Sequence, residues 1–146
     1  MEIAISNFTL ESYERILGLW KKCEGIGLSD SDSKENIKLY LDRNPNMSFI
    51  AELNNELIGA VLAGHDGRRG YVHHLAVSPD YRRQGIGRLL VDRCLKKLKE
   101  SGILKCHILM FNNNNVGLQF WESIGWFYRD DICIVSKYID STEIHD

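Results

Sequence analysis

The stretch AVSPDYRRQGIGRLLVDRC, residues 76–94, decides the fold. It carries the chain from an apolar, strand-like run through a bend and into an amphipathic helix. Gly85 and Gly87 have no side chains, so a ligand can approach the N–H groups of the first helical turn. Those donors and the positive end of the helix dipole favour phosphate. Three arginines surround the same bend: Arg82, Arg83 and Arg88. The stretch therefore predicts an anion site where a strand passes into a helix.

Two other phosphate-binding loops are excluded by the residues of the bend. A Walker motif requires G-x-x-x-x-G-K-[ST], which occurs nowhere in the chain. The dinucleotide fingerprint G-x-G-x-x-G would need a glycine where the sequence has Leu90. The bend therefore belongs to neither class.

The elements on both sides of the bend form a β-α-β unit. Hydrophobic patterns predict a strand over 71–77, a helix over 85–101 that stops at Gly102, and a strand over 105–111. Two strands joined in this way should be parallel, with a right-handed crossover.

The remaining elements are shorter and follow from the same patterns. Asp32 and Glu35 resemble a capping box that starts a helix, and Asn54-Asn55 suits the tight turn of a hairpin. Helices are predicted over 9–23, 34–43 and 116–125, and strands over 2–6, 48–53, 56–64 and 132–139. The expected fold is a single α/β (α+β) domain over residues 1–146, in which helices flank a mixed sheet.

Composition and charge limit the function. With 146 residues, 44% hydrophobic and 26% charged, the chain has the values of an ordinary globular domain. The net charge of −2 argues against a general nucleic-acid binder, and we expect neither a membrane span nor a signal peptide. The cysteines are too widely spaced for a zinc motif: Cys23, Cys94, Cys106 and Cys133. We expect buried, reduced thiols, no metal and a cytoplasmic location.

Two segments carry a family resemblance. HHLAVSPDYRRQGIGRLLVD, residues 73–92, closely resembles the acetyl-coenzyme A signature of the GNAT superfamily of N-acetyltransferases, in which an apolar-Ala-Val triplet ends a strand and [QR]-x-x-G-x-[GA] starts a helix. NNVGLQFWESIGW, residues 114–126, is similar to a second family segment, N-x-x-[AG]-x-x-[FL]-[YFW]-E-x-x-G-[FW]. The resemblance implies splayed parallel strands and an acetyltransferase that uses acetyl-coenzyme A as cosubstrate.

The resemblance also implies which residues hold the coenzyme. The main chain of Leu75, Ala76 and Val77 would bind the pantetheine arm and the acetyl carbonyl, with the Val77 N–H polarising the acetyl oxygen. Asn114 matches an asparagine that contacts the coenzyme arm. Backbone N–H groups would cradle the pyrophosphate beside the guanidinium of Arg82. They belong to Arg83, Gln84, Gly85, Ile86, Gly87 and Arg88.

The acid that would protonate the leaving thiolate is uncertain from the sequence. Trp121 contacts the coenzyme at the place where many relatives have a tyrosine, and an indole N–H does not give up its proton at neutral pH. Leu109 stands where some relatives have a glutamate. Tyr128 is an alternative acid; otherwise the coenzyme thiolate leaves without one.

Three residues are candidates for the base that accepts the amine proton. Certain relatives have a histidine at the position of His73, and an imidazole titrates near neutrality. His74 and Glu52 are the alternatives, the latter acting through water. Alternation along a strand should send His73 and His74 to opposite faces of the sheet, so at most one of them would face the acceptor.

By the resemblance, the loop over 23–35 walls the acceptor cleft. Its carboxylates would favour a cationic amine: Glu24, Asp30, Asp32 and Glu35. Asp32 equally suits a helix cap. Trp20 and Tyr40 either line the cleft or belong to the core.

Three functions stay open: an N-acetyltransferase for a primary amine of a small molecule or peptide, a protein N-terminal or lysine acetyltransferase, and a catalytically weak acyl-coenzyme A-binding module. None requires nucleic acid or a membrane, and we expect a monomer or homodimer.

Overall fold

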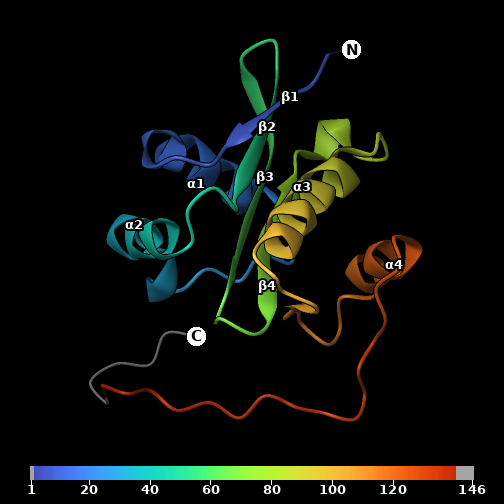
Figure 1. The fold of residues 1–146 in the computed structure, drawn as a ribbon. Coiled ribbons are helices and arrows are strands. Elements are labelled where there is room, and N and C mark those ends of the chain that lie inside the picture. The colour runs from blue at the N-terminus through green and yellow to red at the C-terminus, as the bar shows by residue number, and fades with distance from the viewer. Residues whose placement is uncertain (1, 141–146) are drawn as a thin grey trace.

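A five-stranded sheet in the order β1-β2-β3-β4-β5 crosses the computed structural model, which describes residues 2–140 (Figure 1). The strands are β1 (Ala4–Asn7), β2 (Phe49–Leu53), β3 (Glu56–His65), β4 (Gly70–Val77) and β5 (Cys106–Ile108). Neighbours from β1 to β4 pair antiparallel, whereas β4 and β5 pair parallel. The predicted mixed sheet and its parallel β-α-β unit are confirmed.

Helices cover both faces of this sheet (Figure 1). The helices α1 (Tyr13–Lys22) and α2 (Lys34–Arg43) share one face, and α3 (Ile86–Glu100) and α4 (Asn115–Ser123) lie on the other side. Short 3₁₀ turns precede three of the helices: η1 (Leu10–Ser12), η2 (Asp30–Asp32) and η3 (Pro79–Tyr81). No helix within residues 2–140 is long and apolar enough to cross a membrane.

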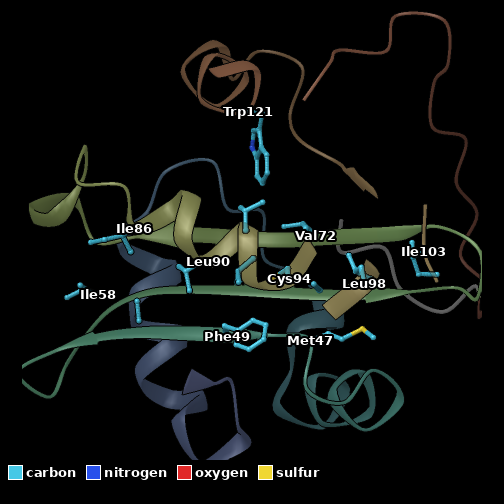
Figure 2. Close-up of a cluster of buried hydrophobic side chains, with 14 residues drawn as sticks. Met47, Phe49, Ile58, Val72, Ile86, Leu90, Cys94, Leu98, Ile103 and Trp121 are labelled. Carbon is cyan, nitrogen blue, oxygen red and sulfur yellow. The ribbon is translucent and has the colours of Figure 1, made fainter. Parts of the chain in front are cut away.

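Each face has its own apolar core. Figure 2 shows the cluster under α3, where Leu90 and Cys94 are fully buried and Trp121 of α4 points toward the same cluster. The opposite cluster is built around Trp20 of α1 and Ile37 of α2. Burial of such side chains contributes about 1.5–3 kcal/mol each, so both helical layers are fixed to the sheet.

The predicted turn chemistry is largely confirmed. Asn54 and Asn55 have φ values of 51° and 66°, the left-handed pair that a tight hairpin turn requires. Gly102, just beyond α3, has φ +83° and ends the helix as expected. The predicted capping box was wrong: Ser29 and Asp32 form the box at η2, while the Ser33 side chain caps α2 by accepting from the Asn36 N–H at 3.2 Å.

The C-terminal part of the chain differs most from the prediction. The strand predicted over 105–111 is reduced to the three residues of β5, and the strand predicted over 132–139 does not form. All residues from 131 to 140 are exposed, and Cys133, which we expected to be buried, is exposed with them. A strand needs a partner as well as a suitable composition, and composition does not specify that partner.

Candidate active site

Strand β4 has a β5 partner along only part of its length. The parallel pairs run from Gly70 with Cys106 to Val72 with Ile108, and none follows from His73 onward. Within residues 2–140 the end of β4 therefore keeps β3 on one side and has no paired strand on the other. This is the splay of parallel strands that the sequence resemblance implied.

The register shows which main-chain groups face the splay. The Ser78 N–H donates to the Ile58 carbonyl at 2.8 Å, so Gly59 and Val77 form a pair without mutual hydrogen bonds. The N–H and C=O of Val77 therefore point away from β3, as do those of Leu75, whereas Ala76 is directed toward β3. The three residues predicted to bind the pantetheine arm thus divide into two that face the splay and one that does not.

A bulge at His74 produces this arrangement. The register between β3 and β4 shifts between Ala60 and Leu62, and His74 has a left-handed φ of 50°. The extra residue places both histidine rings on the α1–α2 face: His74 packs edge-on against Trp20 of α1, and His73 against Tyr40 of α2. The prediction that the two histidines face opposite ways was wrong, because alternation holds only for a regular strand.

His74 is paired with a carboxylate from the loop between α1 and α2. Its Nε2 lies 2.8 Å from Oδ1 of Asp32, and their side chains are only 19% and 10% exposed. Oδ2 of Asp32 accepts from the Ser29 N–H at 3.0 Å. An Nε2–H donor to the carboxylate would leave Nδ1 as a proton acceptor, so Asp32 fixes the tautomer of His74.

The surroundings of this pair are mostly buried and joined by a hydrogen bond and a ring contact. The Tyr13 hydroxyl donates to the Asp32 carbonyl at 2.6 Å, which holds η2 against α1. The rings of Trp20 and His74 are 5.0 Å apart, and Trp20 is 1% exposed. Its Nε1–H is the one buried side-chain donor without a partner among residues 2–140.

His73 has a different environment. Its ring stacks on Tyr71 and meets Tyr40 edge-on, and it forms no ion pair within residues 2–140. Burial, and then the neighbouring charge of His74, lower the pKa of His73 below its usual 6.5. The side chain is therefore neutral at pH 7.

The predicted anion loop has the geometry of an open amide cradle. Arg83 and Gly85 have left-handed φ values of 63° and 80°, separated by Gln84. Left-handed residues among such turns are typical of concavities in which successive N–H groups bind an anion. A Cβ added at Gly85 would meet nothing within 4 Å, and the first turn of α3 contains no acidic residue. Gly87 also serves packing, because a Cβ there would lie 3.1 Å from the Phe120 ring.

The three arginines of the loop have different partners. The Arg82 side chain donates to Glu24 at 2.7 Å and to the Val77 carbonyl at 3.2 Å, so it ties the loop to the chain between α1 and α2. Arg88 lies 3.9 Å from Asp92 in an exposed i,i+4 pair. Arg83 has no ion pair within residues 2–140 and is the guanidinium most available to an anion.

Other predicted residues lie around the splay or away from it. Asn114 caps α4 by accepting from the Gly117 N–H at 2.9 Å, and a Cβ at Gly25 would lie 3.0 Å from its amide nitrogen. Trp121 is 5% exposed and packs against Phe120 and Trp126, so its ring is mainly a core element. Leu109, beyond the end of β5, is 56% exposed.

Two candidate catalytic residues are not brought to the bulge. Glu52 is on β2, two strands from β4, and forms an ion pair with Arg15 at 2.9 Å. Tyr128 is 61% exposed in the segment after α4. Residues 2–140 contain no group of three His, Cys, Asp or Glu side chains suited to a metal.

Sequence reasoning missed two long-range pairs, Asp32 with His74 and Glu24 with Arg82. The only available signals were the acidic loop and the His-His doublet, which contain no information on pairing. The Glu24–Arg82 pair also neutralises part of the acidic rim expected at the acceptor cleft.

Comparisons with known proteins agree with this geometry. A sequence model of the Acetyltransferase (GNAT) family matches residues 13–126. An acetyltransferase of Pectobacterium atrosepticum is 32% identical over 143 residues, which cover 98% of this chain and 99% of the relative.

Solved structures share the fold. The PaiA N-acetyltransferase of Thermoplasma acidophilum, in complex with coenzyme A, aligns with a TM-score of 0.75 and 21% identity over 89% of this chain and 92% of that one. AAC(6')-Iy, in complex with the bisubstrate analogue CoA-S-monomethyl-acetylneamine, gives a TM-score of 0.76 and 16% identity over 94% and 99% of the two chains.

Proposed function

The chain belongs to the GNAT acetyltransferase family, and we propose that it moves the acetyl group of acetyl-coenzyme A directly to a primary amine of a small molecule or peptide. The observation that carries the proposal is the unpaired end of β4 beside an open amide cradle at the start of α3. The unpaired end of β4 provides main-chain groups for a pantetheine arm, and the amide cradle provides donors for a diphosphate. The distance between them along the chain is only a few residues.

The coenzyme would be held mainly by the backbone. N–H groups of residues 83–88 and the Arg83 guanidinium would bind the diphosphate, and Leu75 would bind the pantetheine arm through its main chain. The Val77 carbonyl already accepts from Arg82, which leaves the Val77 N–H to stabilise the developing oxyanion. The bound thioester supplies an electrophilic carbonyl and a thiolate leaving group.

The acceptor amine must lose a proton during transfer. An alkyl amine with a pKa of about 10.4 is neutral in only about one molecule in two thousand at pH 7. His74 is the base that the geometry favours, because Asp32 orients its ring and leaves Nδ1 to accept a proton. His73 contacts aromatic rings instead, and Glu52 lies two strands away.

We infer that the thiolate takes its proton from solvent. Trp121 is buried in the α3–α4 core, and its indole N–H does not give up a proton at neutral pH. Tyr128 is 61% exposed in the segment beyond that core. A coenzyme thiolate is a tolerable leaving group in water, since a thiol pKa is far below that of an alcohol.

The test combines calorimetry with release of free coenzyme thiol over a panel of primary amines. Gly85→Ala should weaken binding of acetyl-coenzyme A by about tenfold or more, because the added Cβ strains a left-handed residue inside the cradle. Gly102→Ala is the matched control: it has nearly the same φ, +83° against +80°, and equally open surroundings, but lies at the other end of α3.

The two halves of the proposal can fail separately. Equal weakening by both variants, or no binding of the cosubstrate, would refute the cradle. Tight binding without turnover on any amine would instead favour the binding module over the transferase.

A further inference from the structure

A row of aromatic and imidazole rings continues from the bulge of β4 along the α1–α2 face of the sheet. His73 stacks on Tyr71, with ring centres 6.2 Å apart, and the Tyr71 ring lies 5.7 Å from that of His107 on β5. Tyr40 of α2 reaches only His73, and within residues 2–140 no ring of α1 or α2 contacts Tyr71 or His107. Both of these side chains are partly exposed. The row therefore leads from the proposed base to a part of this face that a ligand can reach.

Cations gather at the far end of this row. The Gly70 N–H donates to the Lys105 carbonyl at 2.9 Å, which holds the start of β4 beside the start of β5. A Cβ at Gly70 would lie 2.9 Å from Leu98 of α3, so alternation directs the preceding Arg69 to the α1–α2 face. The Cys106 sulfur lies on the α3 side, 3.4 Å from the same Cβ, and the same alternation places Lys105 on the α1–α2 face.

One of these cations has no carboxylate partner. After the larger effect of burial, Lys105, Arg129 and Arg69 all lower the pKa of His107, so the three cations lie within electrostatic range of its ring. Arg69 and Arg129 each form an ion pair with an aspartate of their own turn. Lys105 is exposed and forms no ion pair within residues 2–140. Its ammonium is therefore the charge most available to an anionic ligand.

The opposite end of the row carries negative charge. The Asp32 carboxylate lies 2.8 Å from His74, beside the place where the amine must react. Three residues of strand separate His74 from Tyr71, a distance of about 10 Å. The face thus presents a carboxylate at the reacting end and cations at the other. This pattern is complementary to a molecule that has an amine at one end and an anion at the other.

We propose that the acceptor carries a carboxylate about 10 Å from its reactive amine, and that Lys105, supported by Arg69, binds this carboxylate at the end of the ring row. The inference rests on the proposed function, because the same site positions the amine. The chain that joins the two groups would lie against the rings of His73 and Tyr71. A short peptide with a free C-terminus has these dimensions, since three extended residues span about 10 Å.

The test compares trialanine with trialanine amide, which lacks the C-terminal charge, on the full-length protein loaded with coenzyme A. In an NMR titration, trialanine should shift the ring resonances of Tyr71 and His107. It should also bind about fivefold more tightly than the amide, the effect of one close charge pair in contact with water. Lys105→Gln should remove this preference. Lys96→Gln is the matched control, because Lys96 is also exposed but lies on α3, on the other side of the sheet.

Turnover separates this inference from the proposed function. With acetyl-coenzyme A, kcat/KM for thiol release should favour trialanine over its amide by the same factor as binding does. Preferential binding of trialanine without thiol release would support the carboxylate site and refute the transferase. Equal binding of the two peptides, unshifted rings of Tyr71 and His107, or equal effects of the two lysine variants would overturn the carboxylate site, even if both peptides are acetylated.

Discussion

The two ends of β4 show how one strand serves two purposes. From Gly70 to Val72 it is paired on both sides and its Val72 side chain is completely buried. From His73 to Val77 it is paired only with β3, contains a bulge, and presents two histidine rings to the α1–α2 face. We propose that the paired end stabilises the fold, while the splayed end leaves main-chain groups and a base for chemistry.

The largest expected effect is on the splayed end. His74→Gln should lower kcat/KM for thiol release by about 100-fold at pH 7, the usual contribution of a positioned base. Asp32→Asn should lower it by less, because the asparagine can still accept from the Ser29 N–H but binds the His74 ring less strongly than a carboxylate does. Both values come from initial rates at saturating acetyl-coenzyme A.

The pH profile separates catalysis from folding. We measure kcat/KM against pH, and His74→Gln should abolish an acidic limb that the base produces. His65→Gln, at the far end of β3, is the control and should keep it. An acidic limb unchanged in His74→Gln would assign the base elsewhere.

A substitution at the paired end of β4 should lower stability and leave the rate unchanged, which is the opposite of the effect expected at the splayed end. Val72→Ala removes two buried methyl groups and is expected to lower the free energy of unfolding by about 2 kcal/mol. Its kcat/KM should match the wild type at temperatures where both are folded. Urea titration and thiol-release rates on the same preparation make the comparison, and a large loss of rate with unchanged stability would contradict the division of roles.

The sequence predicted the parts of this division that depend on local chemistry. The bend at Gly85 could be predicted because a left-handed glycine, a helix start and nearby arginines all lie within a few residues. The bulge could not, since His74 is a non-glycine residue in a left-handed conformation and nothing in its neighbours requires it.

The pairing of residues far apart in the chain could not be predicted from the sequence either. Asp32 was recognised as a capping residue, which it is, but it caps η2 and pairs with a histidine 42 positions away. The strand predicted over 132–139 does not form within residues 2–140, because a strand needs a partner that its own composition does not specify.

A smaller effect is expected on the stability of the fold when the pH is lowered. Because burial lowers the pKa of His73, the unfolded chain binds a proton that the folded chain does not as the pH falls below about 6.5. The stability that neutral His73 contributes is therefore complete above that pH and is lost progressively below it. His73→Gln should flatten the dependence of Tm on pH between 7.5 and 5.5, measured by calorimetry; an identical slope in both proteins would place the titrating group elsewhere.

The smallest effect is expected at Glu52, which lies outside the comparison altogether. Its ion pair with Arg15 is partly exposed, with side chains 27% and 45% accessible, and such pairs contribute about 0–1 kcal/mol. Glu52→Gln should thus lower the free energy of unfolding by no more than about 0.5 kcal/mol and leave kcat/KM and its pH profile unchanged. The same assays used for His74→Gln measure it. A loss of rate comparable to that of His74→Gln would mean that a carboxylate two strands from the bulge reaches the amine through water, and that the chemistry is not confined to the splayed end of β4.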